Sequence, residues 1–128
     1  MLKIFNDLRD FIEDSTREIN VREYARLMNI SPPTASKILS EYENQKILQK
    51  REDKGYLLFK GDIYSWIFID LSRLYYKFKT IDMIEYINEK LNFPLVILFG
   101  SLSKGENNAK SDIDLCIITK SKEKLIFH

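Results

Sequence analysis

Hydrophobic residues recur at helical spacing through the first third of the chain. Over residues 2–14 an apolar side chain recurs every three or four positions and Asp and Arg occupy the others, which predicts an amphipathic helix with its charges on the exposed face. Asn20 is a favourable N-cap, and the apolar residues after it predict a second, shorter helix over residues 21–29. The apolar positions are Ile4, Phe5, Leu8, Phe11 and Ile12 in the first helix and Val21, Tyr24, Ala25 and Met28 in the second.

The stretch SPPTASKIL predicts a third helix. Ser31 is an N-cap residue, and Pro32 occupies the first helical position, where no backbone N–H is needed. The apolar stripe of this helix consists of Ala35, Ile38, Leu39 and Tyr42, and the opposite face is small and polar. Residues 46–61 then predict two short strands around the turn EDKG, in which Gly55 takes the positive φ that the turn requires.

Helix, helix, capped helix and hairpin is the element order of a winged helix, and residues 1–61 resemble the winged helix-turn-helix DNA-binding domains. The resemblance implies that the third helix reads base edges in the major groove of duplex DNA, while the wing contacts phosphates. Five basic and two acidic residues between positions 46 and 60 give this segment a local charge of +3. The residues predicted to contact DNA are Thr34, Ser36, Lys37, Ser40, Lys50, Arg51 and Lys54. The alternative is a winged helix used for packing or for protein contacts.

Residues 62–92 form a connector, and its first part, residues 62–79, is apolar on nearly every side. A helix of this composition must be covered on more than one face, so we expect either the two halves of the chain or a second subunit to cover it. The connector therefore predicts an interdomain core or a homodimer, with a cofactor site built from its aromatic residues as the alternative. Thr80 is a candidate N-cap for a further helix over residues 81–91.

The last third of the chain predicts two strands with a polar loop between them. LVILF, residues 95–99, is a continuous apolar run of strand length. Gly100 and Ser101 follow at once, and a glycine lets the backbone approach a phosphate while a serine adds a hydroxyl donor. On the second strand Asp112 and Asp114 lie two residues apart, so they project to the same face. Two such carboxylates predict a site for a hard divalent cation such as Mg²⁺.

A Gly-Ser pair, ten intervening residues and Asp-x-Asp resemble the signature of the nucleotidyltransferase superfamily that includes DNA polymerase beta, in particular its minimal members. The resemblance implies that the Gly-Ser turn holds a nucleoside triphosphate and that the two aspartates hold metal ions that bridge it. Where the family often has arginine this chain has lysine, which supplies charge without a bidentate fork. The implied nucleotide-binding residues are Gly100, Ser101, Lys104 and Gly105, and the implied catalytic and metal-binding residues are Asp112 and Asp114.

In that superfamily a third carboxylate on a later strand completes the second metal site. Fourteen residues follow Asp114, whereas a helix, a strand and their connections need more than about 20. Glu123 is the one acidic residue among them, and we interpret it as a solvated charge rather than the missing ligand. Residues 93–128 are therefore interpreted as an incomplete module, which leans on the connector, pairs with another subunit or begins a longer domain.

Composition limits the classes of partner. Twenty basic and 19 acidic residues give a formal charge of +1, so any nucleic-acid face must be local. The single cysteine, Cys116, lies in an apolar run and is interpreted as a small buried hydrophobe. No apolar run approaches the ~20 residues of a membrane span, and the charged N-terminus does not resemble a secretion signal. We therefore expect a cytoplasmic protein with no membrane partner.

These patterns predict an α+β protein in three parts: a winged helix-turn-helix over residues 1–61, a helical connector over residues 62–92, and an incomplete nucleotidyltransferase-like α/β module over residues 93–128. The first functional hypothesis is a regulatory DNA-binding protein whose module binds a metal-nucleotide weakly. The second is an active nucleotidyltransferase, or a fragment of one, that transfers a nucleotidyl group from a nucleoside triphosphate to a hydroxyl acceptor.

Overall fold

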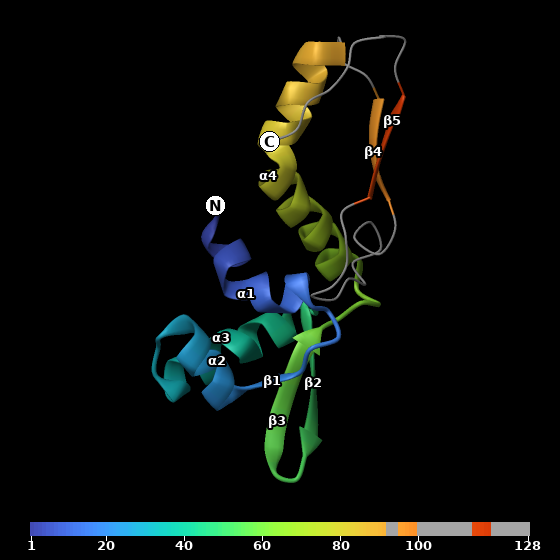
Figure 1. Cartoon of the computed structure of the whole chain (residues 1–128). Coiled ribbons are helices and arrows are strands. Elements are labelled where there is room, and N and C mark those ends of the chain that lie inside the picture. The colour runs from blue at the N-terminus through green and yellow to red at the C-terminus, as the bar shows by residue number, and fades with distance from the viewer. Residues whose placement is uncertain (92–94, 100–113, 119–128) are drawn as a thin grey trace.

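The computed structural model describes residues 1–91, 95–99 and 114–118. Its class is mixed α and β, as the sequence predicts. In chain order the elements are α1 (Lys3–Glu13), β1 (Ile19–Asn20), α2 (Val21–Met28), α3 (Pro32–Asn44), β2 (Leu48–Asp53), β3 (Tyr56–Gly61), α4 (Trp66–Leu91), β4 (Leu95–Phe99) and β5 (Asp114–Ile118), as shown in Figure 1.

One hydrophobic core joins the first three helices, the small sheet and the start of α4. The sheet is antiparallel in the order β1-β3-β2, with Phe59 of β3 between Ile19 of β1 and Lys50 of β2. The side chains at the centre of this core are fully buried and include Phe5, Leu8, Phe11, Ile12, Tyr24, Leu39 and Phe59. The apolar faces predicted for the first three helices are therefore confirmed, and we call residues 1–61 the N-terminal body.

The predicted caps of α2 and α3 are also confirmed. The Asn20 side chain accepts a hydrogen bond from the Glu23 N–H at 2.8 Å, and the Ser31 hydroxyl accepts one from the Thr34 N–H at 3.4 Å. Each bond satisfies a backbone donor that has no partner inside its helix. Asn29 ends α2 in the left-handed conformation, at φ 56° and ψ 49°.

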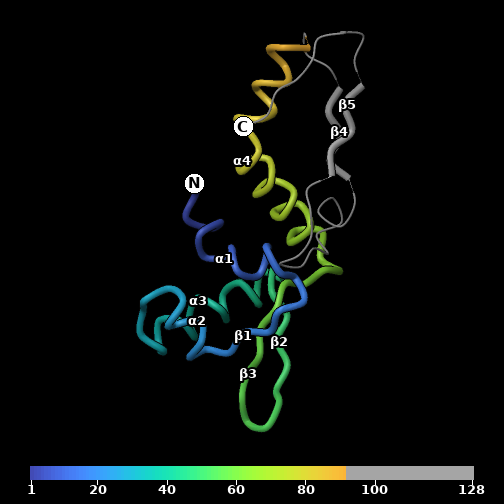
Figure 2. The backbone as a smooth tube through the Cα atoms, in the orientation of Figure 1, coloured from blue at the N-terminus to red at the C-terminus, as the bar shows by residue number. Residues whose placement is uncertain are grey.

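The hairpin of β2 and β3 closes through a two-residue turn. Asp53 pairs with Tyr56, and the residues between them, Lys54 and Gly55, have φ of 51° and 82°. Positive φ at both positions is typical of the turn whose twist matches that of a two-stranded ribbon, which confirms the prediction for Gly55. The tip of the hairpin extends beyond the first three helices, on the side opposite α4 (Figure 2).

The connector contains one continuous helix of 26 residues, α4, instead of two. The prediction that Thr80 caps a second helix is wrong: Thr80 lies inside α4, is buried, and donates its hydroxyl hydrogen bond to the Tyr76 carbonyl at 2.7 Å. A threonine inside a helix satisfies its hydroxyl in this way, so its capping tendency does not end the helix. Within the described residues, no helix is both long and apolar enough to cross a membrane.

The first half of α4 packs one face on the N-terminal body. Phe68 is fully buried against Gly61, at a spacing that leaves no room for a side chain at residue 61. The Tyr75 ring meets the Phe5 ring edge-on, with their centroids 5.9 Å apart. The Tyr75 hydroxyl donates to the Glu13 carboxylate at 2.5 Å, which ties α4 to the end of α1.

The strand predicted over residues 95–99 is confirmed as β4. It pairs antiparallel with β5, from Leu95 opposite Ile118 to Phe99 opposite Asp114. Cys116 lies in the middle of β5, opposite Ile97.

Candidate functional site

The predicted DNA-contacting residues of the third helix lie mostly on its open face. Ala35 and Leu39 are fully buried in the core and so fix the rotation of α3. Thr34, Lys37 and Ser40 are therefore exposed, whereas Ser36 is half-buried. α3 thus presents short polar side chains, one lysine and the acidic Glu41 to solvent.

The hairpin cations are less available than the sequence suggests. The Arg51 guanidinium holds the Glu18 carboxylate with two hydrogen bonds, from Nε to Oε2 at 2.5 Å and from Nη2 to Oε1 at 2.9 Å. These bonds raise the pKa of Arg51 and lower the pKa of Glu18 below its usual value. The Lys50 ammonium lies 3.8 Å from a carboxylate oxygen of Glu43. Lys54, at the turn, is exposed and forms no ion pair with any described residue.

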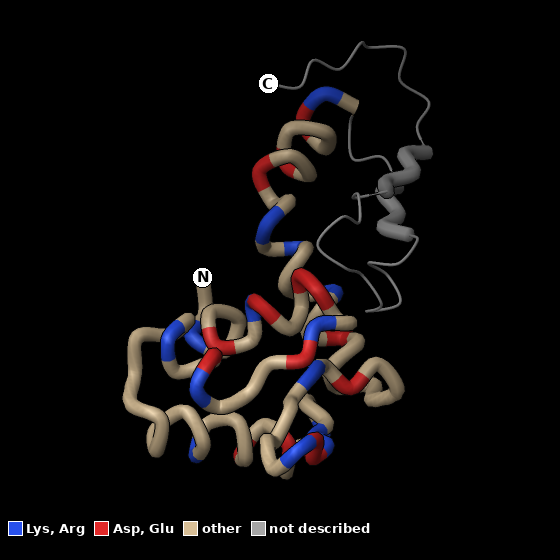
Figure 3. Tube along the Cα trace, turned by 60° about the horizontal axis from the view of Figure 1, so that its bottom comes forward, with Lys and Arg blue, Asp and Glu red and all other residues tan. Residues whose placement is uncertain are grey.

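Lys and Arg are interspersed with Asp and Glu over the N-terminal body (Figure 3). Within residues 1–61, this interspersed pattern disfavours long-range steering of a polyanion. Attraction of nucleic acid must depend on a few cations at close range, as the net charge of the sequence predicts.

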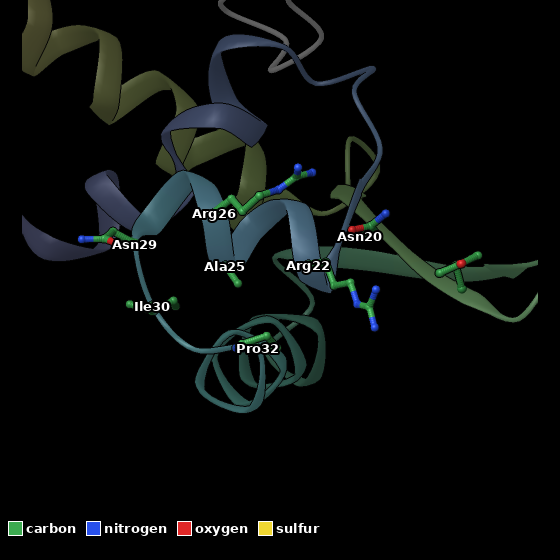
Figure 4. A pocket seen from close by; sticks show the side chains of 8 residues that line it. Asn20, Arg22, Ala25, Arg26, Asn29, Ile30 and Pro32 are labelled. Atoms are coloured by element: carbon green, nitrogen blue, oxygen red, sulfur yellow. The ribbon is translucent and has the colours of Figure 1, made fainter.

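An open groove of about 800 Å³ lies between α2, the start of α3 and the tip of the hairpin (Figure 4). Arg22 and Arg26, one turn apart on α2, are both exposed, and Tyr56 of the hairpin is 60% exposed. Neither arginine forms an ion pair with a described residue. The residues that line the groove include Asn20, Arg22, Arg26, Asn29, Pro32 and Tyr56.

None of the groove residues is among those predicted to contact DNA. The available signal is the pair of arginines four residues apart on the polar face of the second predicted helix. The contribution of Tyr56 depends on where the hairpin tip lies relative to α2, and local sequence carries no information about that distance.

A buried polar contact fixes the first three helices relative to one another. Asp7 is 6% exposed although its place on the first helix predicted an exposed charge, and that prediction is wrong. Its backbone carbonyl accepts a hydrogen bond from the Tyr24 hydroxyl at 2.9 Å, and its carboxylate accepts one from the Tyr42 hydroxyl at 2.7 Å. Burial, with the nearby Asp7 charge, raises the pKa of both tyrosines above the usual range. Because α2 and α3 are both tied to α1, the open face of α3 and the groove are held rigidly.

The described residues that border the C-terminal motif are paired at one end of the β4–β5 pair. Phe99 is the last residue of β4 and is paired with Asp114, the first residue of β5. Gly100 and Ser101 follow Phe99 directly in the chain, and Asp112 precedes Asp114 by two residues. Both halves of the motif are thus connected to the same end of the strand pair. The predicted site residues that lie outside the described part of the chain are Gly100, Ser101, Lys104, Gly105 and Asp112.

Residues 82–127 match the family model described as Polymerase beta, Nucleotidyltransferase. The match includes every residue of the Gly-Ser and Asp-x-Asp motif and begins within α4, and it supports the superfamily that the motif predicts. We call residues 82–127 the nucleotidyltransferase-like region. Comparisons with curated proteins and with solved structures gave no significant match.

Proposed function

We propose that the nucleotidyltransferase-like region binds a nucleoside triphosphate together with Mg²⁺. The observation that carries this proposal is the pairing of Phe99 with Asp114, because it connects both halves of the family motif to one end of a strand pair. Backbone N–H groups and a serine hydroxyl at such a turn are suitable donors to phosphate oxygens. Two carboxylates supply the hard oxygen ligands that Mg²⁺ prefers.

Each residue has a distinct role in this proposal. Asp112 and Asp114 would hold the Mg²⁺, and Gly100 and Ser101 would hold the phosphates. Lys104 adds positive charge to the same loop. When bound, Mg²⁺ would neutralise charge on the phosphate oxygens and so favour in-line displacement at phosphorus.

Calorimetry with ATP and the other nucleoside triphosphates, with and without Mg²⁺, tests the binding step. We expect Mg²⁺-dependent binding that weakens more than about tenfold in Asp112→Asn with Asp114→Asn, since both carboxylate ligands of the metal ion are lost. Glu85→Gln is the matched control, because Glu85 lies in the same region and is an exposed acid of α4. Equal binding by the double variant and the control would refute the proposed site.

Nucleotidyl transfer is the second candidate activity of this region, and the family match favours it. In that reaction a hydroxyl oxygen of the acceptor bonds to the α-phosphorus and the bond to pyrophosphate breaks. Incubation with nucleotides labelled at the α-phosphate, followed by analysis of protein and nucleic-acid acceptors, detects it. Label that appears in an acceptor with the unmodified chain but not with Asp112→Asn would establish transfer, whereas Mg²⁺-dependent binding without label would leave binding as the function.

We further propose that the N-terminal body is a winged helix that binds duplex DNA. This is supported by the exposed polar face of α3 beside a groove with two arginines that form no ion pair with a described residue. Short polar side chains on α3 allow close approach to base edges, while Lys54 at the wing tip is placed for a phosphate. A regulatory role would follow from recognition of a particular DNA sequence.

The ion pairs of the hairpin change which cations we expect to contact DNA phosphates. A phosphate would compete with Glu18 for the Arg51 guanidinium, so Arg51 should add little to affinity. Arg22, Arg26 and Lys54 have no such competitor among the described residues and should supply most of the phosphate contacts.

Fluorescence anisotropy with a labelled duplex, measured over a series of salt concentrations, tests this assignment. Each lost phosphate contact should flatten the slope of log K against log salt by about 0.9. Arg22→Ala with Arg26→Ala and Lys54→Ala should therefore flatten it by about 2 to 3. Lys3→Ala with Lys90→Ala is the control, because both lysines are exposed and lie on other elements. No binding of the unmodified protein at low salt would reject the DNA proposal while leaving the nucleotide proposal untouched.

A further inference from the structure

The outer face of α4 carries an apolar stripe that the N-terminal body covers only in part. The Phe78 ring lies beside the Phe5 ring of α1, with their centroids 5.6 Å apart, and Leu71 packs against the core. Ile67, Leu74, Phe78 and Ile81 are each between 42% and 49% exposed, and Tyr64, just before the helix, is 85% exposed. Large apolar residues that share one helix face and remain this exposed indicate an interaction surface. We call the following residues the α4 seam: Tyr64, Ile67, Leu71, Leu74, Phe78 and Ile81.

The spacing of the α4 seam points to a helix as its partner. Its members are separated by alternating steps of three and four residues, which is the heptad pattern of helices that pack side by side. The inner face of α4, with Phe68, Tyr75 and Tyr76 buried in the core, lies on another side of the same helix. α4 therefore has one face buried against the N-terminal body and a second face, exposed at Ile67, Leu74 and Ile81, that another helix can cover.

We propose that the α4 seam is the interface between two copies of this chain, which associate through their α4 helices. The charges beside the seam support a second copy as the occupant. Lys77 lies next to the seam and is exposed, with acidic Asp70 and Asp82 one to two turns away. Asp70 also lies 3.3 Å from the Arg73 guanidinium of its own helix, in a pair exposed to solvent. In an antiparallel pair Lys77 of one copy lies beside Asp70 of the other, and in a parallel pair it lies beside Asp82.

This interface is isologous, because the same residues contribute from both copies. An antiparallel pair sets Leu71 opposite Leu74 and Ile67 opposite Phe78, so an aliphatic side chain opposes each aromatic one. The contact area along about four helical turns is modest, so we expect association in the micromolar range rather than an obligate dimer. The sequence predicts that the connector mediates a homodimer, and this proposal names the face of α4 that would form the interface.

Sedimentation velocity of the full chain from 1 to 100 μM tests the proposal. We expect a monomer–dimer equilibrium that Leu74→Glu shifts to monomer. Leu27→Glu is the matched control, because Leu27 is an exposed leucine on another helix, 43% exposed against 42% for Leu74. The control should dimerise like the unmodified protein.

Charge exchange and cross-linking keep the test independent of folding defects. Lys77→Glu should weaken dimerisation several-fold. Adding Asp70→Lys should restore it if the pair is antiparallel, whereas adding Asp82→Lys should restore it if the pair is parallel.

Cross-linking distinguishes the two orientations independently. Leu74→Cys in a Cys116→Ser background should form a disulfide dimer readily in a parallel pair, and Leu71→Cys with Leu74→Cys should do so in an antiparallel pair.

Two results would overturn the proposal. One is an unmodified protein that remains monomeric at 100 μM. The other is a Leu74→Glu variant, shown by circular dichroism to be folded, that dimerises as strongly as Leu27→Glu. A monomer whose thermal stability falls in Leu74→Glu would instead mean that the chain covers the seam with its own residues.

Discussion

The inner and outer faces of α4 are both apolar, yet their surroundings differ. On the inner face Phe68 fills the space beside Gly61, and Tyr75 packs on α1 with its hydroxyl on Glu13. On the outer face Ile67 and Leu74 remain exposed. The inner face has a hydrogen bond to another helix and a close fit between a ring and a glycine. Within the described residues, the outer face has neither at Ile67 or Leu74. Apolar character alone therefore does not tell which side of a helix joins its own core.

Phe68→Ala is expected to have the largest effect on this comparison. It removes a fully buried ring and leaves a cavity, so the free energy of unfolding should fall by about 3 to 5 kcal/mol. Ile67→Ala, one residue earlier on the exposed face, should cost less than about 1 kcal/mol at concentrations where the protein is monomeric. Denaturation in urea measures both, and equal losses would mean that the two faces are equally buried in solution.

Gly61→Ala should be the next most disruptive change. The added Cβ would overlap the buried Phe68 ring, so we expect a loss of about 1 to 3 kcal/mol in the free energy of unfolding. Gly55→Ala differs because nothing lies within 4 Å of its added Cβ, and its cost would come from the positive φ. If Phe68→Leu relieves the Gly61→Ala defect, the steric cause is established, and a neutral Gly61→Ala would contradict the close approach.

Tyr75→Phe isolates the polar anchor of the inner face. The ring is kept while the hydrogen bond to Glu13 is lost, which should cost about 1 kcal/mol. Tyr64→Phe, at an exposed position, is the control and should be neutral. An unfolding curve for Tyr75→Phe that overlays the unmodified protein would show that ring packing alone holds this face.

Glu13→Gln should have the smallest effect, and one that depends on pH. Burial raises the pKa of Glu13, but the hydrogen bonds from Lys79 and Tyr75 outweigh it, so the pKa in the folded state lies below the usual 4.5. The carboxylate therefore stabilises the fold above pH 4.5, and this stabilisation is lost as the pH falls through the folded-state pKa. The contact is partly exposed, so we expect less than about 1 kcal/mol at pH 7. The difference between the thermal melts of the two proteins should therefore shrink as the pH falls below 4.5. A difference that stays constant down to the folded state's acid limit would exclude this linkage.

The predictions that the structure confirms depend on residues close together in the chain. Asn20 and Ser31 cap helices through N–H groups three residues away, and Gly55 sets a two-residue turn. β1 was not predicted, because two residues are too few to show an alternating pattern and become a strand only beside β3. Asp7 was placed on the wrong face, since its partner Tyr42 lies 35 residues along the chain.

The candidate sites divide in the same way. The spacing of Gly100, Ser101, Asp112 and Asp114 was enough to indicate the superfamily that the match to residues 82–127 supports. By contrast, the bond between Arg51 and Glu18, 33 residues away, leaves no local sign in the sequence. The DNA contact of Arg51 stays a prediction.

The sequence by itself determined the helix starts, the hairpin turn, the strand of residues 95–99 and the nucleotidyltransferase motif, since each depends on side chains within a few residues or at a fixed spacing. Only the tertiary structure decided which face of α4 is buried and which cations are held in ion pairs. It also decided that Arg22, Arg26 and Tyr56 border one groove. Burial and ion pairing depend on the distance between elements that are remote in the chain, and a linear pattern of apolar and charged residues does not contain that distance.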